Sequence, residues 1–430
     1  MPQSDFSKGE NWAVVEVARV QEVRQEAAML HLIPARQTRP DKDVIFALNA
    51  EATRRKQAGE SIINATIGSL MNDDGSLSVL STVTKVLREV PATDWAAYAP
   101  IPGMPPFLNA VIDDTFATQK ALKDSATAVA TPGGTGALRH ALMNYLQSGQ
   151  AMLTPNFYWG PYQTLAEEHE RKVETFNMFT PEGALDVAAL DQKLTEQLKA
   201  QGRVLLILND PCNNPTGYSM TQKEWRSVVE VLLKHADQPV TLLVDMAYWL
   251  YAGAGDHRAF LSELVPLLGK TGLLFAWSGS KTYTHYGLRV GAMIACEPDE
   301  KERNATQAAL AYACRGTWSN CVRGGMIAVT RLLTDPTLKP ACDDERVAFK
   351  SLLQKRVNAF NQAAQPLGLK YPRYEGGFFV TVFHPEAEVQ ARKMQEKGVY
   401  VVPQKGALRV ALCSAAEADV PRLVEALAAK

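Results

Sequence analysis

The sequence predicts an α/β protein built on a mostly parallel sheet. Between residues 204 and 276, short apolar runs alternate with stretches of helical periodicity, an order typical of parallel strands joined by crossover helices. The chain has 430 residues, of which 46% are hydrophobic, and this length exceeds what one compact core accommodates. Both observations together indicate two or three domains, one of them a large α/β domain.

Three buried strands are expected at residues 204–208, 241–244 and 273–276, each a run of apolar side chains. Between the first two strands, Thr221 and Glu224 form a capping box that predicts the start of a helix. Apolar residues at helical spacing mark the face of this helix that packs on the sheet: Trp225, Val228, Val229 and Leu232.

A polar cluster directly follows each of these strands, at residues 209–217, 245–248 and 278–281. Open α/β sheets bind ligands outside the carboxyl ends of their strands. We therefore expect the three clusters to converge on one crevice.

The rest of the chain predicts a smaller α+β domain. We expect an N-terminal segment at 1–75 that is part of this domain, a large domain at 76–334, and the C-terminal part of the small domain at 335–430. The boundary is placed at 335–340, where two prolines interrupt a helical pattern. Helical stretches such as 13–32 carry no motif and are expected to pack on the small domain or on a partner subunit. The small domain should contain a helix at 357–364, the segment 376–380, and a final helix with one apolar face made by Val420, Leu423, Val424 and Leu427.

Composition excludes several kinds of partner. The 45 Lys and Arg residues balance 46 Asp and Glu, so the net charge of -1 provides no global field to attract nucleic acid or an anionic membrane. The six cysteines are scattered, without a C-x-x-C pair or metal-ligand spacing to the seven histidines, which predicts reduced thiols and no metal site. Neither a signal segment nor an apolar run of the roughly 18 residues that a membrane span needs is present. A cytoplasmic protein is expected.

Lys281 and Arg289 carry the most informative chemistry. A lysine that reacts with aldehydes must be neutral part of the time, so its pKa must lie well below the free value of about 10.4. Arg289 offers both a neighbouring cation and a clamp for a phosphate, and Ser278 and Ser280 add short hydroxyl donors. This combination indicates a lysine that holds pyridoxal phosphate. The alternative, solvated loop charges, is the more frequent explanation when the motif stands alone.

Polar residues after the other strands fit the same cofactor. Asp245 is placed to keep a pyridinium nitrogen protonated, which makes the ring an electron sink. Tyr248 and Asn214 are placed to donate hydrogen bonds to the ring oxygen. The alternatives are a helix cap for Asp245, a rim tyrosine for Tyr248 and an ordinary turn for Asn214.

Further candidates lie elsewhere in the chain. Gly134 and Thr135 belong to a glycine-rich segment before a helical pattern, which offers backbone N–H groups to a phosphate. Tyr98 is placed to bring a phenol to the same phosphate, and Phe157 belongs to an aromatic cluster able to stack on a flat ring, although such clusters are usually core. Arg409 lies in an apolar strand and needs an anion, either an internal carboxylate or a substrate carboxylate.

At these residues the chain resembles the class I aminotransferases of the fold-type I pyridoxal-phosphate family, nearest the aspartate and aromatic aminotransferase branch. The resemblance runs from about residue 45 to the C-terminus. It implies a large domain with a mostly parallel central sheet that binds pyridoxal 5′-phosphate, a smaller α+β domain, and a homodimer in which Tyr98 reaches the phosphate of the other subunit. The matching positions are Gly68, Tyr98, Gly134, Thr135, Asn214, Asp245, Tyr248, Ser278, Ser280, Lys281, Arg289 and Arg409.

The resemblance also implies substrate contacts. Arg315 lies in a stretch similar to the one that carries the arginine for a distal substrate carboxylate in this branch, and its alternative is a surface helix arginine. Phe157 occupies a ring-stacking position that is usually tryptophan, with Trp159 two residues later, which loosens the substrate assignment. The candidate substrate-binding residues are Gly68, Asn214, Arg315, Phe379 and Arg409.

The predicted function is transamination by a ping-pong cycle between an amino acid, aspartate or aromatic, and 2-oxoglutarate. Lys281 moves the proton at the substrate Cα, with Asp245 and Tyr248 as the other catalytic residues, and Arg409 binds the α-carboxylate. The alternative is a carbon–sulfur β-lyase or another eliminating enzyme on the same fold. A regulatory module fused to a DNA-binding domain is disfavoured, because the N-terminal segment is too short and not basic enough.

Overall fold

The computed structural model describes residues 31–37, 39–40, 43–253 and 255–429. The helical stretch predicted at 13–32 lies almost entirely outside the described residues. The chain divides between Ala47 and Leu48 into two compact units. The first described helices are α2 (Pro34–Gln37) and α3 (Val44–Gln57).

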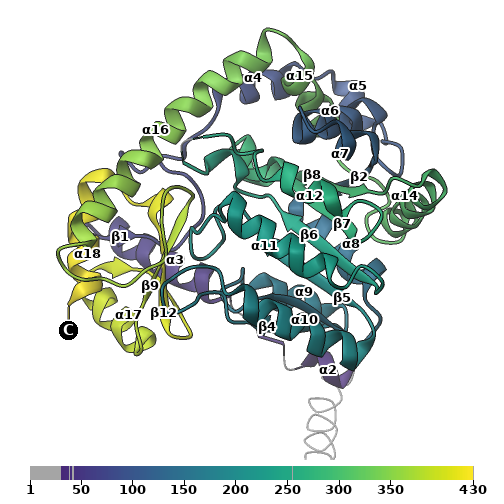
Figure 1. Cartoon of the computed structure of the whole chain (residues 1–430). Coiled ribbons are helices and arrows are strands. Elements are labelled where there is room, and N and C mark those ends of the chain that lie inside the picture. Colours follow the sequence, from purple (N-terminus) through teal and green to yellow (C-terminus); the bar gives the residue numbers. More distant parts are fainter. Residues whose placement is uncertain (1–30, 38, 41–42, 254, 430) are drawn as a thin grey trace, which may run out of the picture. The chain divides into compact units, whose positions relative to one another are not determined.

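The second unit is built on a seven-stranded sheet in the order β2-β8-β7-β6-β5-β3-β4 (Figure 1). Only β8 runs against its neighbours β2 and β7, and every other pair is parallel. The predicted α/β class with a mostly parallel sheet is therefore confirmed, as are the three expected strands. The strands are β2 (Ala126–Pro132), β3 (Ala151–Pro155), β4 (Lys172–Phe176), β5 (Val204–Asn209), β6 (Val240–Asp245), β7 (Gly272–Ser278) and β8 (Val290–Cys296).

Alternate side chains of the central strands point to opposite faces of the sheet, as the β pleat requires. In β5, Leu206 and Leu208 belong to one buried apolar cluster, whereas Leu205 and Ile207 belong to another. Helices cover both faces, so the strands are apolar on both sides. These helices and their neighbours are α4 (Ser81–Glu89), α5 (Ala92–Ala96), α6 (Pro105–Phe116), α7 (Lys120–Asp124), α8 (Gly133–Tyr145), α9 (Pro161–Glu168), α10 (Val187–Gln201), α11 (Gln222–Leu233), α12 (Leu261–Leu264), α13 (Gly279–Thr282), α14 (Glu300–Arg315) and α15 (Arg323–Thr334).

Helix α11 begins at the predicted capping box. The Thr221 hydroxyl accepts from the backbone N–H of Glu224 at 3.2 Å, and the Glu224 carboxylate accepts from the backbone N–H of Thr221 at 2.8 Å. A cap of this kind stabilises a helix by roughly 1 kcal/mol. Trp225, Val228 and Leu232 are fully buried against the sheet, so the predicted packing face is also confirmed.

A second apolar core supports a smaller α+β region. Here β12 pairs antiparallel with both β9 and β11, while β1 pairs parallel with β10. Val420, Leu423 and Leu427 of the final helix are buried in this core, as the apolar stripe predicted. Its elements are β1 (Ile63–Asn64), β9 (Phe379–Phe383), α17 (Ala387–Glu396), β10 (Val399–Tyr400), β11 (Val402–Gln404), β12 (Ala407–Ala411) and α18 (Val420–Ala428), and five short 3-10 helices complete the described chain: η1 (Trp249–Tyr251), η2 (Val265–Leu267), η3 (Tyr286–Leu288), η4 (Leu412–Ser414) and η5 (Glu417–Asp419).

The helix expected at 357–364 is only the last part of α16 (Leu338–Ala364), which is 27 residues long (Figure 1). The prediction was wrong about its start because Pro340 lies in the first turn, where backbone N–H groups have no intrahelical partner. Cys342 joins the large-sheet core and Val357 the smaller core, so α16 connects the two. The domain limits 76–334 and 335–430 remain our proposal. Despite its length, neither α16 nor any other described helix is long and apolar enough to cross a membrane.

Candidate active site

The carboxyl ends of β5, β6 and β7 open onto one cavity of about 190 Å³, the Lys281 cavity. Asn209 at the end of β5 pairs in register with Asp245 at the end of β6, and Ser278 ends β7. The three polar clusters are thus brought together at one edge of the sheet. The cavity is lined by Gly134, Thr135, Leu138, Trp159, Asn209, Asn214, Asp245, Ala247, Tyr248, Ser278, Ser280, Lys281 and Arg289.

Lys281 lies on α13, one turn of helix that follows β7 directly. The Ser278 hydroxyl caps this turn by accepting from the backbone N–H of Ser280. The Lys281 Nζ lies 5.4 Å from the ring centre of Tyr248 and 5.5 Å from that of Tyr286. Burial lowers the pKa of the Lys281 amine to about 8, and the nearby Arg289 adds to the fall. A useful fraction of this amine is therefore neutral near physiological pH.

Asp245 is buried at the end of β6, where burial raises the pKa of its carboxyl group. The Tyr162 hydroxyl donates a 2.7 Å hydrogen bond to Asp245 Oδ2, and the Ala247 backbone N–H donates to Oδ1 at 3.2 Å. Both bonds oppose the effect of burial and favour the carboxylate. Tyr162 was not among the residues predicted from the sequence. The only signal was its position in the first turn of α9, just after an aromatic run.

An amide network holds Asn214 beside Tyr248. Asn209 donates to the Asp245 backbone carbonyl at 2.8 Å and accepts from the Asn214 backbone N–H at 2.7 Å. The Asn214 side chain donates to the Tyr248 hydroxyl at 3.3 Å. Asn209, which the sequence analysis included only as the start of a polar cluster, therefore fixes the loop that presents Asn214.

Arg289 and the first turn of α8 also line the cavity. Arg289 donates to the Ser280 hydroxyl at 3.1 Å and to the Pro132 backbone carbonyl at 3.3 Å. A Cβ atom on Gly133 would lie 2.5 Å from Arg289 Nη2, so only glycine lets the guanidinium lie along the start of α8. Gly134 and Thr135 follow in the same turn, with their backbone N–H groups at a helix N-terminus.

Arg409, Phe379 and Gly68 gather on the side of Tyr248 that faces the smaller region. The Arg409 guanidinium lies 4.8 Å from the ring centre of Phe379 and donates to the backbone carbonyl of Thr66. The Phe379 and Tyr248 rings lie 5.7 Å apart. A Cβ atom on Gly68 would lie 2.5 Å from the Phe379 ring, so the close approach requires glycine there.

Six of the predicted site residues do not line the Lys281 cavity, and two of them, Tyr98 and Arg315, lie exposed at the surface. Tyr98 lies in a loop with 87% of its surface exposed. Arg315 is the last residue of α14, is exposed, and donates to the Ser319 hydroxyl at 2.6 Å. Neither residue lines the cavity.

Phe157 requires a correction. Its ring is partly buried against the large apolar core, 6.1 Å from Phe179 and 5.6 Å from Phe383, whereas Trp159 lines the Lys281 cavity. The chain turns between β3 and α9, and this turn directs the residue two positions later into the cavity. Sequence position alone could not distinguish these two aromatic residues.

With this geometry established, comparisons identify the family. The model for "Aminotransferase class I and II" matches residues 60–427. The chain therefore belongs to this family and is an amino-group-transferring enzyme, a transaminase.

Individual relatives agree with this assignment. An aromatic-amino-acid aminotransferase of Pseudomonas aeruginosa is 30% identical over 322 residues, covering 71% of this chain and 76% of the relative. An aspartate aminotransferase of Salmonella typhi is 27% identical over 315 residues, covering 71% and 77%. The crystal structure of an aminotransferase from Anaerococcus prevotii superposes with a TM-score of 0.88 and 32% identity, covering 92% of this chain and 98% of that one. The alternative of a carbon–sulfur β-lyase is not favoured by these relatives.

Proposed function

We propose that the enzyme is a pyridoxal 5′-phosphate-dependent aminotransferase that exchanges amino groups between aspartate or an aromatic amino acid and 2-oxoglutarate. One observation carries the proposal: Lys281, with its lowered pKa, shares a single cavity with a buried carboxylate at Asp245 and a guanidinium at Arg289. These are the three groups needed to hold an aldehyde, a ring nitrogen and a phosphate.

The cavity suits this cofactor in two further respects. The Oδ1 atom of the buried Asn214 amide has no hydrogen-bond partner among the described residues, so this atom is available to a polar group in the cavity. The glycines at the start of α8 leave room beside Arg289 and Ser278: a Cβ atom on Gly134 would already lie 3.4 Å from that of Ser278. Lys281, Asp245 and Asn214 would hold the ring, and Ser278, Ser280, Arg289, Gly134 and Thr135 would hold the phosphate.

The residues of the chain divide the work of the reaction. When bound, the cofactor withdraws electrons from the substrate Cα, so that the Cα proton can leave. The Lys281 amine takes this proton and returns it, because a pKa of about 8 lets it act as both base and acid near neutral pH. The Asp245 carboxylate, held by Tyr162, keeps the ring nitrogen protonated.

Substrate carboxylates are assigned to two arginines. Arg409 binds the α-carboxylate, supported by its position beside Phe379 and Tyr248. Arg315 binds the distal carboxylate of a dicarboxylate substrate. Since Arg315 and Tyr98 are exposed and do not line the cavity of their own chain, we assign both to the cavity of a second subunit in a homodimer.

The assignment of Arg315 is tested by Arg315→Ala. Loss of a bidentate partner should lower kcat/KM for aspartate by about 100-fold while changing kcat/KM for phenylalanine much less. An equal fall for both donors would contradict the distal-carboxylate role. Arg331→Ala, which removes an exposed arginine paired with Glu89, is the matched control and should leave both values unchanged.

The cofactor and the half-reaction are tested together by absorbance spectroscopy. We expect an absorbance band between roughly 360 and 430 nm, as for a lysine-bound cofactor. The band should bleach with aspartate and return with 2-oxoglutarate. A band that ignores aspartate but bleaches with phenylalanine would shift the donor assignment to aromatic amino acids. No band after adding pyridoxal phosphate would contradict the proposal.

A cytoplasmic location is also proposed. All six cysteines are free thiols, five of them buried, which fits a reducing compartment. Fractionation of the source cells with an antibody to the protein would test this location.

A further inference from the structure

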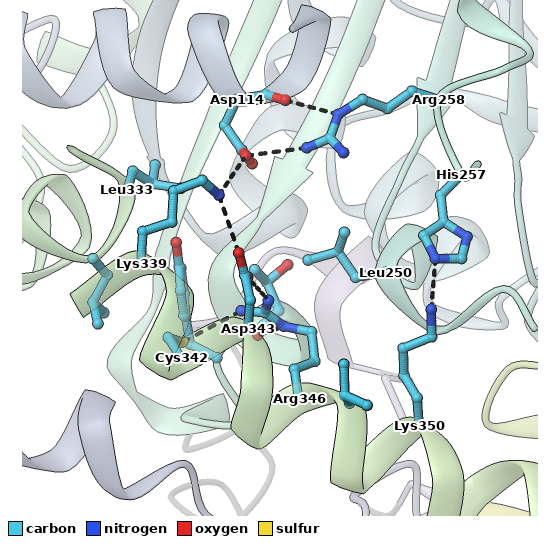
Figure 2. A pocket seen from close by; sticks show the side chains of 14 residues that line it. Asp114, Leu250, His257, Arg258, Leu333, Lys339, Cys342, Asp343, Arg346 and Lys350 are labelled. Atoms are coloured by element: carbon cyan, nitrogen blue, oxygen red, sulfur yellow. Dashed lines mark hydrogen bonds and ion pairs between the residues drawn. The ribbon is translucent and has the colours of Figure 1, made fainter. Parts of the chain in front are cut away.

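A second polar cavity of about 220 Å³, the Lys350 cavity, is lined in part by Thr282 and Tyr283, the two residues that follow Lys281. Its other lining residues come from the end of α6, from η1 and the loop after it, from the last turn of α15 and from the first turns of α16. Figure 2 shows Lys350 facing His257 on one side of this cavity, with Lys339, Asp114 and Asp343 on the other.

Positive charge exceeds negative charge in this cavity. Four cationic side chains line it, two carboxylates line it, and the difference is an excess of two positive charges. The cationic side chains are Arg258, Lys339, Arg346 and Lys350, and the carboxylates are Asp114 and Asp343. His257 adds no charge near neutral pH, because burial and the neighbouring Lys350 lower its pKa to about 4.

The carboxylates are shared among three of the four cations. Asp114 contacts Arg258 at 3.1 Å and Lys339 at 3.6 Å, while Asp343 contacts Lys339 at 3.4 Å and also pairs with Arg346. Lys350 has no carboxylate partner in the described part of the chain, and its ammonium donates instead to His257 Nε2 at 2.7 Å. Partly buried cations without full compensation are costly unless an anion joins them.

The walls and the entrance of the cavity favour a small anion. Leu250, Leu332, Leu333 and Val347 line it, and such apolar walls strengthen charge interactions by lowering the local dielectric constant. The side chains of Lys339 and Asp343 are 43% and 48% exposed, so the cavity is reachable from solvent.

We infer that the Lys350 cavity is a binding site for a small dianion, inorganic phosphate or a short dicarboxylate, held by Lys350, Arg346 and Lys339. Occupancy is linked to the catalytic lysine through one hydrogen bond. Arg346 Nε donates to the backbone carbonyl of Thr282 at 3.1 Å, and Thr282 follows Lys281 on α13. A bound dianion therefore strengthens the contact between α16 and α13 and stabilises the folded enzyme.

The test is isothermal titration calorimetry with inorganic phosphate on the cofactor-saturated enzyme in a phosphate-free buffer. Saturation keeps Arg289 and Ser278 of the Lys281 cavity from binding free phosphate. We expect one saturable phosphate site per chain, weakened at least about tenfold in Lys350→Met, since a charge-assisted hydrogen bond is lost. Lys193→Met is the matched control: it makes the same change in net charge on α10, where Lys193 pairs with Glu196, and should bind phosphate normally.

Two further arms complete the experiment. If Lys350→Met does not fold, Lys339→Gln replaces it, since Lys339 is half-exposed and its loss should also weaken phosphate at least about tenfold. Succinate that displaces phosphate identifies a dicarboxylate as the preferred dianion, and failure to displace identifies phosphate. Absence of a saturable site, or equal phosphate affinity in the unchanged enzyme and both variants, would overturn the inference. If the cofactor proposal fails instead, the unchanged enzyme should bind phosphate at two sites, and Lys350→Met should lose one of them and keep the one in the Lys281 cavity.

Discussion

The Lys281 cavity and the Lys350 cavity are both lined by residues of α13, but the two lysines have different neighbours. Lys281 lies beside Asp245 in a cavity built at strand ends, whereas Lys350 lies among other cations in a cavity built mainly by a long helix. Burial lowers the pKa of both lysines, but only Lys281 has a buried carboxylate in the same cavity. The difference shows that a lowered pKa does not by itself identify a catalytic lysine. The groups that surround the lysine decide whether it can take part in catalysis.

Removing each lysine in turn tests whether the two cavities differ in function. Lys281→Ala should lower kcat by about 10⁴-fold, because the group that moves the Cα proton is lost. Lys350→Met should leave kcat within about twofold, since Lys350 lies outside the Lys281 cavity. Steady-state kinetics with saturating substrates measures both values, and a comparable loss in the two variants would show that the cavities are not distinct in function.

Asp245→Asn tests the carboxylate that distinguishes the Lys281 cavity. The amide keeps the shape but cannot hold a proton on a ring nitrogen, so kcat should fall by about 10²- to 10³-fold. Asp343→Asn is the matched change in the Lys350 cavity and should leave kcat nearly unaltered. Single-turnover measurements with aspartate would separate the chemical step from product release, and an unchanged chemical step in Asp245→Asn would argue against the electron-sink role.

Tyr162→Phe tests how the Asp245 carboxylate is held. Removing the hydroxyl deletes one 2.7 Å hydrogen bond to the carboxylate and should lower kcat about tenfold, with little change in KM. The pH profile distinguishes positioning from packing, because the loss should grow toward low pH as Asp245 becomes easier to protonate. Tyr158→Phe, whose ring stacks on Tyr162 6.2 Å away, should leave the profile unchanged.

The stability of the cofactor-free protein tests the lowered pKa of Lys281 without catalysis. Lys281 has a pKa of about 8 when folded and about 10.5 when unfolded, so the unfolded state binds more protons between these values. Stability therefore rises with pH through this window, and below pH 8 the buried charge costs on the order of 3 kcal/mol. Lys281→Met should melt higher than the unchanged protein at pH 7, with the advantage shrinking toward pH 10.

Differential scanning calorimetry across this pH range measures the effect. An advantage that is constant with pH would mean that the methionine acts through packing and that the Lys281 charge is not penalised. Lys350→Met is the comparison variant. The change in its melting temperature on adding phosphate reports on phosphate binding in the Lys350 cavity.

Parallel-sheet rules explain why much of the Lys281 cavity could be predicted. Residues that follow adjacent parallel strands must meet at one edge, so Asn214, Asp245 and Lys281 could be placed together from the sequence. Tyr162 could not, because its bond joins α9 to the end of β6 across 83 positions of the sequence, and no spacing rule relates the two. Nor could the sequence show that Trp159 lines the cavity in place of Phe157, because this depends on the path of the turn between β3 and α9.

The Lys350 cavity had no signature in the sequence. Its charged residues come from α6, the loop after η1 and α16, and no spacing rule relates positions 114, 257 and 350. We also predicted a domain boundary at 335–340, within which α16 begins. The predicted helix at 357–364 therefore did not include Lys339, Arg346 and Lys350, which all lie on α16. Tertiary packing alone creates this site.

The central claim is that Lys281 is the residue that holds the cofactor. It is tested most directly by reducing the cofactor-loaded enzyme with borohydride, digesting it and locating the modified lysine by mass spectrometry. We expect a phosphopyridoxyl group on the peptide that contains Lys281, and no modification at Lys350. Modification of a different lysine, or of none, would contradict it.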